Sequence, residues 1–158
     1  MRILGIDPGI AIVGFGVVDY TGGKFHVADY GQVTSPAKMP VPARLKLVFD
    51  DISYVIEKYK PDEVAIEELF FNTNQKTAIN VAMARGVLIV AAQNAGLSLS
   101  EYTPLQVKQA VVGYGRAEKE QVQQMVKLIL GLNEVPKPDD AADALALAIC
   151  HAHSAVRL

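Results

Sequence analysis

The sequence predicts an α/β fold built on a mixed five-stranded sheet flanked by helices. Up to Thr34, three runs rich in Val, Ile and aromatic residues are separated by short turn signals, which is typical of an antiparallel meander. After Thr34, two short apolar runs alternate with segments whose apolar residues recur at helical spacing, and strands joined by helical crossovers pair in parallel. No internal repeat or linker interrupts this order, so residues 1–158 are expected to form a single domain.

The three N-terminal strands follow from residue type and turn signals. The apolar run at 2–7 ends in the Asp-Pro-Gly turn at 7–9. A second strand is expected over 12–20, where β-branched and aromatic residues predominate. The Thr-Gly-Gly turn at 21–23 then leads into a third strand over 24–34.

Helical periodicity begins after these strands. Residues 42–59 carry apolar side chains at spacings of three and four, and Pro61 ends this helix. Short strands are expected at 64–67 and 97–102, on either side of a long helix at 75–95. Three further helical segments complete the chain, at 104–112, 118–130 and 139 to about 155.

Composition and charge limit the class of protein. No apolar run is long enough to span a membrane, and the N-terminal run is too short for a secretory signal peptide. The one cysteine, Cys150, has no partner for an internal disulfide and is expected to pack in a core, in a reducing cytoplasm. The net charge of −2 gives no overall sign of nucleic-acid binding, so such a function requires a local basic patch.

Acidic residues from three distant segments are predicted to meet. Asp7 ends the first strand, Glu67 and Glu68 end the fourth, and Asp140 and Asp143 share one face of the last helix. Sites in α/β sheets gather beyond the carboxyl ends of the strands. Clustered carboxylates repel one another, and divalent cations that prefer oxygen ligands, Mg²⁺ or Mn²⁺, relieve that repulsion. Each acid alone has a simpler explanation, since Asp is also common in turns and at helix starts.

The order of motifs resembles the RuvC family of bacterial Holliday-junction resolvases along nearly the whole chain. The matching segments are GIDPG at 5–9, VGFG at 13–16, AIE at 65–67 with Phe70, QVKQAVVG at 106–113, AEK at 117–119 and DAADALA at 140–146. The resemblance implies a ribonuclease H-like fold and a homodimer. It also implies Mg²⁺-dependent, symmetric nicking of four-way DNA junctions that leaves 5′-phosphate and 3′-hydroxyl ends, and coupling to the RuvA and RuvB branch-migration complex.

The resemblance also assigns the site. It places the catalytic, metal-binding acids at Asp7, Glu67, Asp140 and Asp143, and leaves Asp139 as the cap of the last helix. Two Mg²⁺ ions, for which Mn²⁺ substitutes, would be held with Asp7 between them, Glu67 on one ion and the two aspartates on the other.

DNA contacts are expected from local basic and aromatic residues. Lys108 and Lys119 match positions that are basic in the family, and Lys76 and Arg116 lie on or between the later helices. Phe70 directly follows the catalytic strand, where an aromatic ring can stack on an unpaired base. The alternative is that these lysines and arginines are solvated and that Phe70 is a core residue.

Other residues receive structural interpretations. Arg85 and Lys127 are expected on the solvated surface, and His26, His151 and His153 at the surface or at helix ends. Small and apolar residues on most sides of the helix segment 77–95 indicate burial in a core or against a second copy of the chain.

Three rival functions remain open from the sequence. An ATP-binding protein of the actin and sugar-kinase kind shares the first turn but needs a second domain and a second phosphate loop, which this chain lacks. An RNA-processing nuclease of the same fold would lack the 106–119 block and the paired aspartates. A junction-binding protein without catalysis would not need all four acids.

Overall fold

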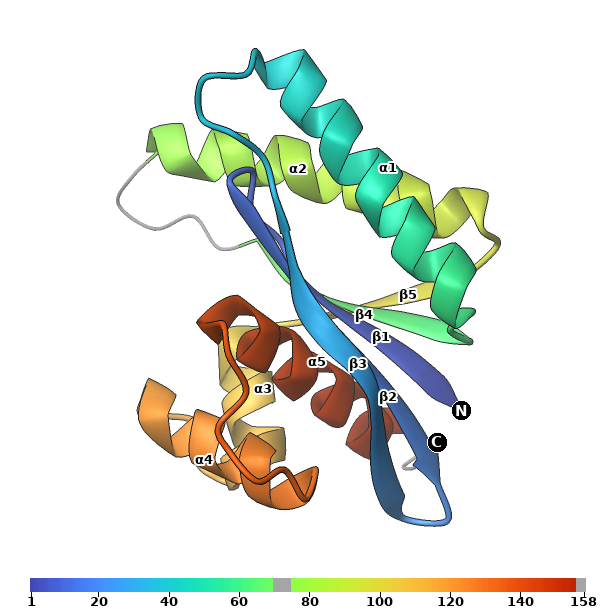
Figure 1. The fold of residues 1–158 in the computed structure, drawn as a ribbon. Helices are drawn as coiled ribbons and strands as arrows, with labels where there is room; N and C mark the ends of the chain where they lie inside the picture. The colour runs from blue at the N-terminus through green and yellow to red at the C-terminus, as the bar shows by residue number, and fades with distance from the viewer. Residues whose placement is uncertain (70–74, 156–158) are drawn as a thin grey trace.

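A five-stranded mixed sheet forms the centre of the molecule in the computed structural model, which describes residues 1–69 and 75–155 (Figure 1). The strand order is β3-β2-β1-β4-β5. The first three strands pair antiparallel, whereas β1, β4 and β5 run parallel, which confirms the predicted mixed sheet. The strands are β1 (Arg2–Asp7), β2 (Ile12–Thr21), β3 (Lys24–Thr34), β4 (Glu63–Glu67) and β5 (Ser98–Tyr102).

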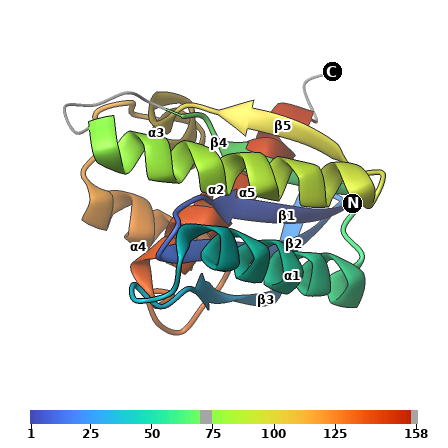
Figure 2. The same ribbon diagram turned by 90° about the horizontal axis from the view of Figure 1, so that it is seen from above.

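Five helices cover the two faces of the sheet in the described ranges (Figure 1). On one face, α1 and α2 lie side by side, as the view from above also shows (Figure 2). On the other face, α5 lies directly on the sheet, with α3 and α4 packed against it. The helices are α1 (Val41–Tyr59), α2 (Gln75–Asn94), α3 (Pro104–Val112), α4 (Lys119–Ile129) and α5 (Asp139–Ala155).

Alternation along β1 divides the core into two layers. Leu4 and Ile6 pack with the α1 and α2 side, whereas Ile3 packs with α5. Asp7 continues the alternation of Ile3 and Gly5, so its side chain belongs to the α5 face. The same alternation in β4 puts Glu67 on the face of Ala65, which also packs with α5.

Glycines allow α5 to lie unusually close to the sheet. A Cβ atom built on Gly5 would lie 2.0 Å from the carbonyl oxygen of Ala144. A Cβ atom on Gly16 would lie 2.8 Å from the Leu145 side chain. Because nearly all of α5 beyond its first turn is buried, its register against the sheet is closely determined.

Two expectations about polar residues are wrong. His151 is only 3% exposed, and its Nε2 lies 2.5 Å from Glu63 Oε2 while its Nδ1 lies 2.8 Å from the Tyr102 hydroxyl. Arg85 is not solvated, because its Nη2 lies 2.7 Å from Glu101 Oε2 and its side chain is 14% exposed. In both cases a carboxylate partner on the parallel strands makes burial of the polar group favourable.

The expectations for Cys150, His26 and His153 hold. Cys150 is buried, and its thiol lies 3.7 Å from the carbonyl oxygen of Gln106. His26 is exposed, and His153 lies in the last turn of α5, where its Nδ1 donates to the Ala110 carbonyl. In the ranges that the structure describes, none of the helices combines the length and hydropathy needed to cross a membrane.

Candidate active site

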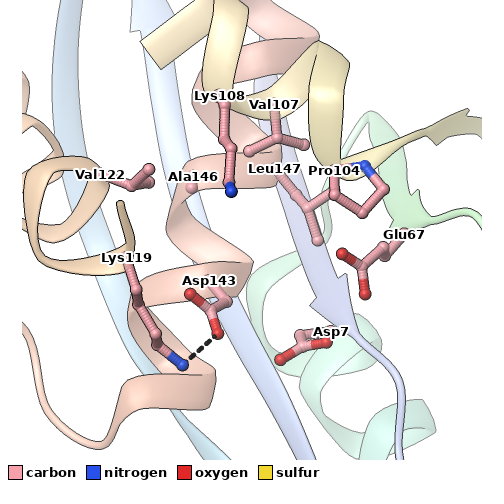
Figure 3. Close-up of a pocket in the computed structure, with 10 residues that line it drawn as sticks. All are labelled: Asp7, Glu67, Pro104, Val107, Lys108, Lys119, Val122, Asp143, Ala146 and Leu147. Carbon is pink, nitrogen blue, oxygen red and sulfur yellow. Dashed lines mark hydrogen bonds and ion pairs between the residues drawn. The ribbon is translucent and has the colours of Figure 1, made fainter. Parts of the chain in front are cut away.

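A cavity of about 260 Å³ opens at the carboxyl ends of β1 and β4, next to the helical layer of α3, α4 and α5 (Figure 3). Three of the four predicted acids, Asp7, Glu67 and Asp143, line it together with Lys108 and Lys119. Apolar groups complete the wall, among them Val107, Val122 and Leu147. The structure therefore brings together residues that are more than 130 positions apart in the sequence.

Parallel pairing of β1 with β4 sets Asp7 beside Glu67. Gly5 is in register with Ala65 and Ile6 with Ile66, so the next residues on the two strands are the two acids. Arg85 holds the end of β4 from the other side, because its Nε donates to the Glu67 carbonyl at 3.1 Å. Sequence patterns give no sign of this arginine contact, since it joins a helix interior to a strand end.

The start of α5 delivers the other two acids. The Pro138 carbonyl accepts the N–H groups of Ala141 and Ala142, so Pro138 holds the N-cap position that was expected for Asp139. Asp139 is the first residue of α5, and its carboxylate pairs with Lys137 at 3.2 Å. Asp143 then reaches the cavity one turn later, whereas Asp140 lies outside the set of residues that line it.

The carboxylates carry an unbalanced negative charge. Burial, reinforced by Glu67, Asp143 and Asp140, raises the pKa of Asp7 to about 8. Burial and the charge of Asp143 also raise the pKa of Glu67. The pKa of Asp143 is raised by burial as well, although Lys119 opposes that shift. Asp140 is therefore part of the same electrostatic cluster, even though it does not line the cavity.

Lys119 is the closest described cation to these acids. Its Nζ lies 3.1 Å from Asp143 Oδ2 and 3.7 Å from Asp139 Oδ2. Figure 3 shows the Asp143 carboxylate turned toward this ammonium group, and Lys108 reaching toward the cavity from α3.

The other predicted DNA contacts are placed differently. Lys76 is exposed in the first turn of α2, and Arg116 is exposed in the connection between α3 and α4. Neither lines the cavity, in contrast to Lys108 and Lys119. Phe70 lies outside the described residues.

The donor set suits a hard divalent cation. All four acids offer oxygen ligands, and the raised pKa values of Asp7, Glu67 and Asp143 indicate that the charges of these three lack sufficient compensation. Within residues 1–69 and 75–155, no three acidic, histidine or cysteine side chains are already converged as a metal site. The residues thus fit a cation in type and place, and their side chains must still converge around it.

Comparison with known proteins identifies the relatives of the chain. Residues 3–151 match the family model described as "Crossover junction endodeoxyribonuclease RuvC". A protein of that name from Alkaliphilus oremlandii is 60% identical over 154 residues, which cover 98% of this chain and 94% of the relative. Another, from Clostridioides difficile, is 62% identical over 154 residues, with 98% of this chain and 91% of the relative covered.

The fold agrees with a solved structure. The chain is similar to Thermus thermophilus RuvC in complex with a Holliday junction substrate, with a TM-score of 0.94 and 41% sequence identity. The match covers 98% of this chain and 94% of that one. The predicted ribonuclease H-like fold is confirmed by this likeness.

Proposed function

The chain belongs to the RuvC family of crossover junction endodeoxyribonucleases, and from this premise we propose that it resolves four-way DNA junctions by paired, symmetric nicks. The observation that carries the proposal is the meeting of Asp7, Glu67 and Asp143 in one cavity beside Lys108 and Lys119. The acids offer oxygen ligands for the divalent cations that promote phosphodiester hydrolysis. The lysines offer positive charge that binds the phosphates of the DNA backbone. The products are 5′-phosphate and 3′-hydroxyl ends.

The catalytic acids are Asp7, Glu67, Asp140 and Asp143. When bound, a pair of Mg²⁺ or Mn²⁺ ions supplies Lewis-acid activation of water and stabilises the leaving oxygen. Asp7 is central to the set, because its pKa responds to the charges of the other three acids. Glu67 is proposed to bind a cation from the strand side of the site, and Asp140 and Asp143 are proposed to bind one from the α5 side.

DNA binding requires cations near the scissile phosphate and farther along the strands. Lys108 and Lys119 lie in the cavity wall and contact the phosphate that is cut. Lys76 and Arg116 are exposed and contact phosphates farther away. Phe70, outside the described residues, is proposed to stack on a base at the junction centre.

A homodimer positions two such sites on a symmetric junction. One face of α2 packs on α1 and contacts β5, and the other exposes Ile79 (58%), Met83 (36%) and Val90 (51%). These apolar residues recur along one side of the helix, and Met83 and Val90 line a shallow groove shared with α1. We assign this face to contact with a second copy of the chain.

Residues 1–158 act as a single nuclease domain in the cytoplasm. The RuvA and RuvB branch-migration complex is the proposed partner that delivers junctions to it.

A nicking assay separates this function from its rivals. Synthetic four-way junctions, linear duplexes and RNA hairpins are incubated with the protein, with and without Mg²⁺. We expect Mg²⁺-dependent cuts at symmetric positions in the junction alone. Cleavage of the RNA hairpin in preference to the junction favours the RNA-processing nuclease, and junction binding without cuts favours the non-catalytic binder.

A further inference from the structure

The ammonium group of Lys119 lies beside Asp143, where a positive charge offsets the negative charge of the clustered acids. Its Nζ is 3.1 Å from Asp143 Oδ2, and both side chains are partly exposed, at 51% and 36%. A second carboxylate, of Asp139, is 3.7 Å away. Exposed ion pairs contribute little to folding stability, so this contact has no evident structural purpose.

The start of α4 fixes the position of Lys119 beside Asp143. Lys119 is the first residue of α4, and the Gln121 side chain accepts the Glu118 N–H at 2.8 Å, which defines where the helix begins. Val122, one turn later, is buried against the core that contains α5. The base of the Lys119 side chain is therefore anchored, while its ammonium group lies at the partly exposed end of the side chain.

Asp143, one of the acids that line the cavity, is paired with Lys119. Asp143 is turned toward Lys119, and within the described ranges the acids are not converged as a metal site (Figure 3). The positive charge of Lys119 also opposes the repulsion among Asp7, Glu67 and Asp143. An ammonium group and a divalent cation near the same carboxylate repel each other, so they compete for Asp143.

We propose that Lys119 is the resident counter-ion of Asp143, that it competes with divalent cations in the DNA-free protein, and that transfer of its ammonium group to a DNA phosphate frees Asp143. The inference rests on the proposed metal-dependent nuclease function. A phosphate oxygen is a suitable second acceptor, because lysine binds phosphate as a point charge. Junction binding and metal binding consequently strengthen each other, and the site is completed only on its substrate.

Calorimetric titration of the full chain with Mn²⁺, without DNA, tests this competition. Lys119→Gln removes the ammonium group and is expected to lower the Kd for Mn²⁺ about fivefold, the effect of losing one exposed ion pair. The matched control is Lys127→Gln, which removes a lysine from the last turn of the same helix, outside the residues that line the cavity, and its Kd is expected to stay at the wild-type value. An unchanged or higher Kd for Lys119→Gln overturns the inference.

Asp7→Asn distinguishes failure of this inference from failure of the metal site. If Asp7→Asn weakens Mn²⁺ binding but Lys119→Gln does not strengthen it, the metal site stands and the competition is wrong. If Asp7→Asn binds Mn²⁺ as tightly as the wild type, the proposed metal site fails and the inference fails with it. Thermal unfolding gives a second readout: Mn²⁺ is expected to raise the unfolding temperature of Lys119→Gln by more than that of the wild type.

Discussion

Gly14 of β2 lies so close to α5 that a Cβ atom on it would be 2.0 Å from the carbonyl oxygen of Asp140. Gly14 is also the antiparallel pairing partner of Asp7. One glycine therefore controls the separation between the acid at the end of β1 and the acids at the start of α5. Backbone atoms limit the gap, so a side chain at this position must move the helix.

Gly14→Ala is expected to displace the first turn of α5, with a loss of about 1–3 kcal/mol in unfolding free energy, the usual cost of overpacking. We expect nicking to fall by more than the stability loss explains, since Asp140 and Asp143 move away from Asp7. Gly16→Ala is the matched control, because its Cβ atom would meet the Leu145 side chain first, at 2.8 Å. Unfolding in urea and junction nicking are measured on both variants, and an equal fall in activity in the two would contradict a special role for Gly14.

The metal-free protein is expected to lose stability as pH rises. The folded-state pKa of Asp7 is raised to about 8, above the ordinary value of 3.8, so the folded state binds this proton more tightly than the unfolded chain. The contribution of Asp7 is fully present below about pH 4 and is lost progressively up to about pH 8. In EDTA, Asp7→Asn should reduce this decline by roughly 5–6 kcal/mol, because the two pKa values differ by about four and each pKa unit corresponds to about 1.4 kcal/mol. Equal pH dependence of thermal unfolding in the two proteins would contradict the raised pKa.

Substitution of buried His151 is expected to destabilise the fold without changing the metal dependence of nicking. His151→Ala leaves Glu63 and the Tyr102 hydroxyl without their buried partner, at a cost of about 2–3 kcal/mol. His26→Ala, on an exposed site of β3, should change unfolding free energy by less than about 0.5 kcal/mol. Urea denaturation measures both values, and a neutral His151→Ala would show that this contact is dispensable.

The proposed dimer surface is tested with Val90→Glu. A charge on the exposed apolar face of α2 should convert a dimer into monomers, because an unpaired carboxylate is costly to bury in an interface. Leu128→Glu places the same change on α4, at a residue that is 68% exposed, and should leave the association state unchanged. Sedimentation velocity measures the association state of both variants. A Val90→Glu protein that remains a dimer would contradict the assignment of the interface to this face of α2.

The sequence predicts the elements and the meeting of the acids because both depend on local patterns. Alternation and helical spacing define each strand and helix to within about two residues. Two strands joined by a helical crossover end at the same edge of a sheet, so the order of the elements places Asp7 and Glu67 at one edge. The pairing of β1 with β4 in the structure then sets them side by side.

Contacts between side chains from remote segments could not be predicted in this way. Arg85 and His151 resemble surface residues in their own helices. His151 is nevertheless buried beside a carboxylate on β4, and Arg85 is mostly covered and pairs with a carboxylate on β5. The ion pair between Lys119 and Asp143 depends on how α4 packs against α5, which no periodicity specifies. These details require the packed arrangement of the helices on the sheet.

Asp7 and the acids around it are proposed to cut four-way junctions with divalent cations. The most direct test is nicking of a synthetic four-way junction by Asp7→Asn in Mg²⁺, with junction binding measured on the same preparation. We predict binding close to that of the wild type and a nicking rate lower by about 10³-fold or more. Nicking by Asp7→Asn at the wild-type rate would contradict the proposed role of these acids.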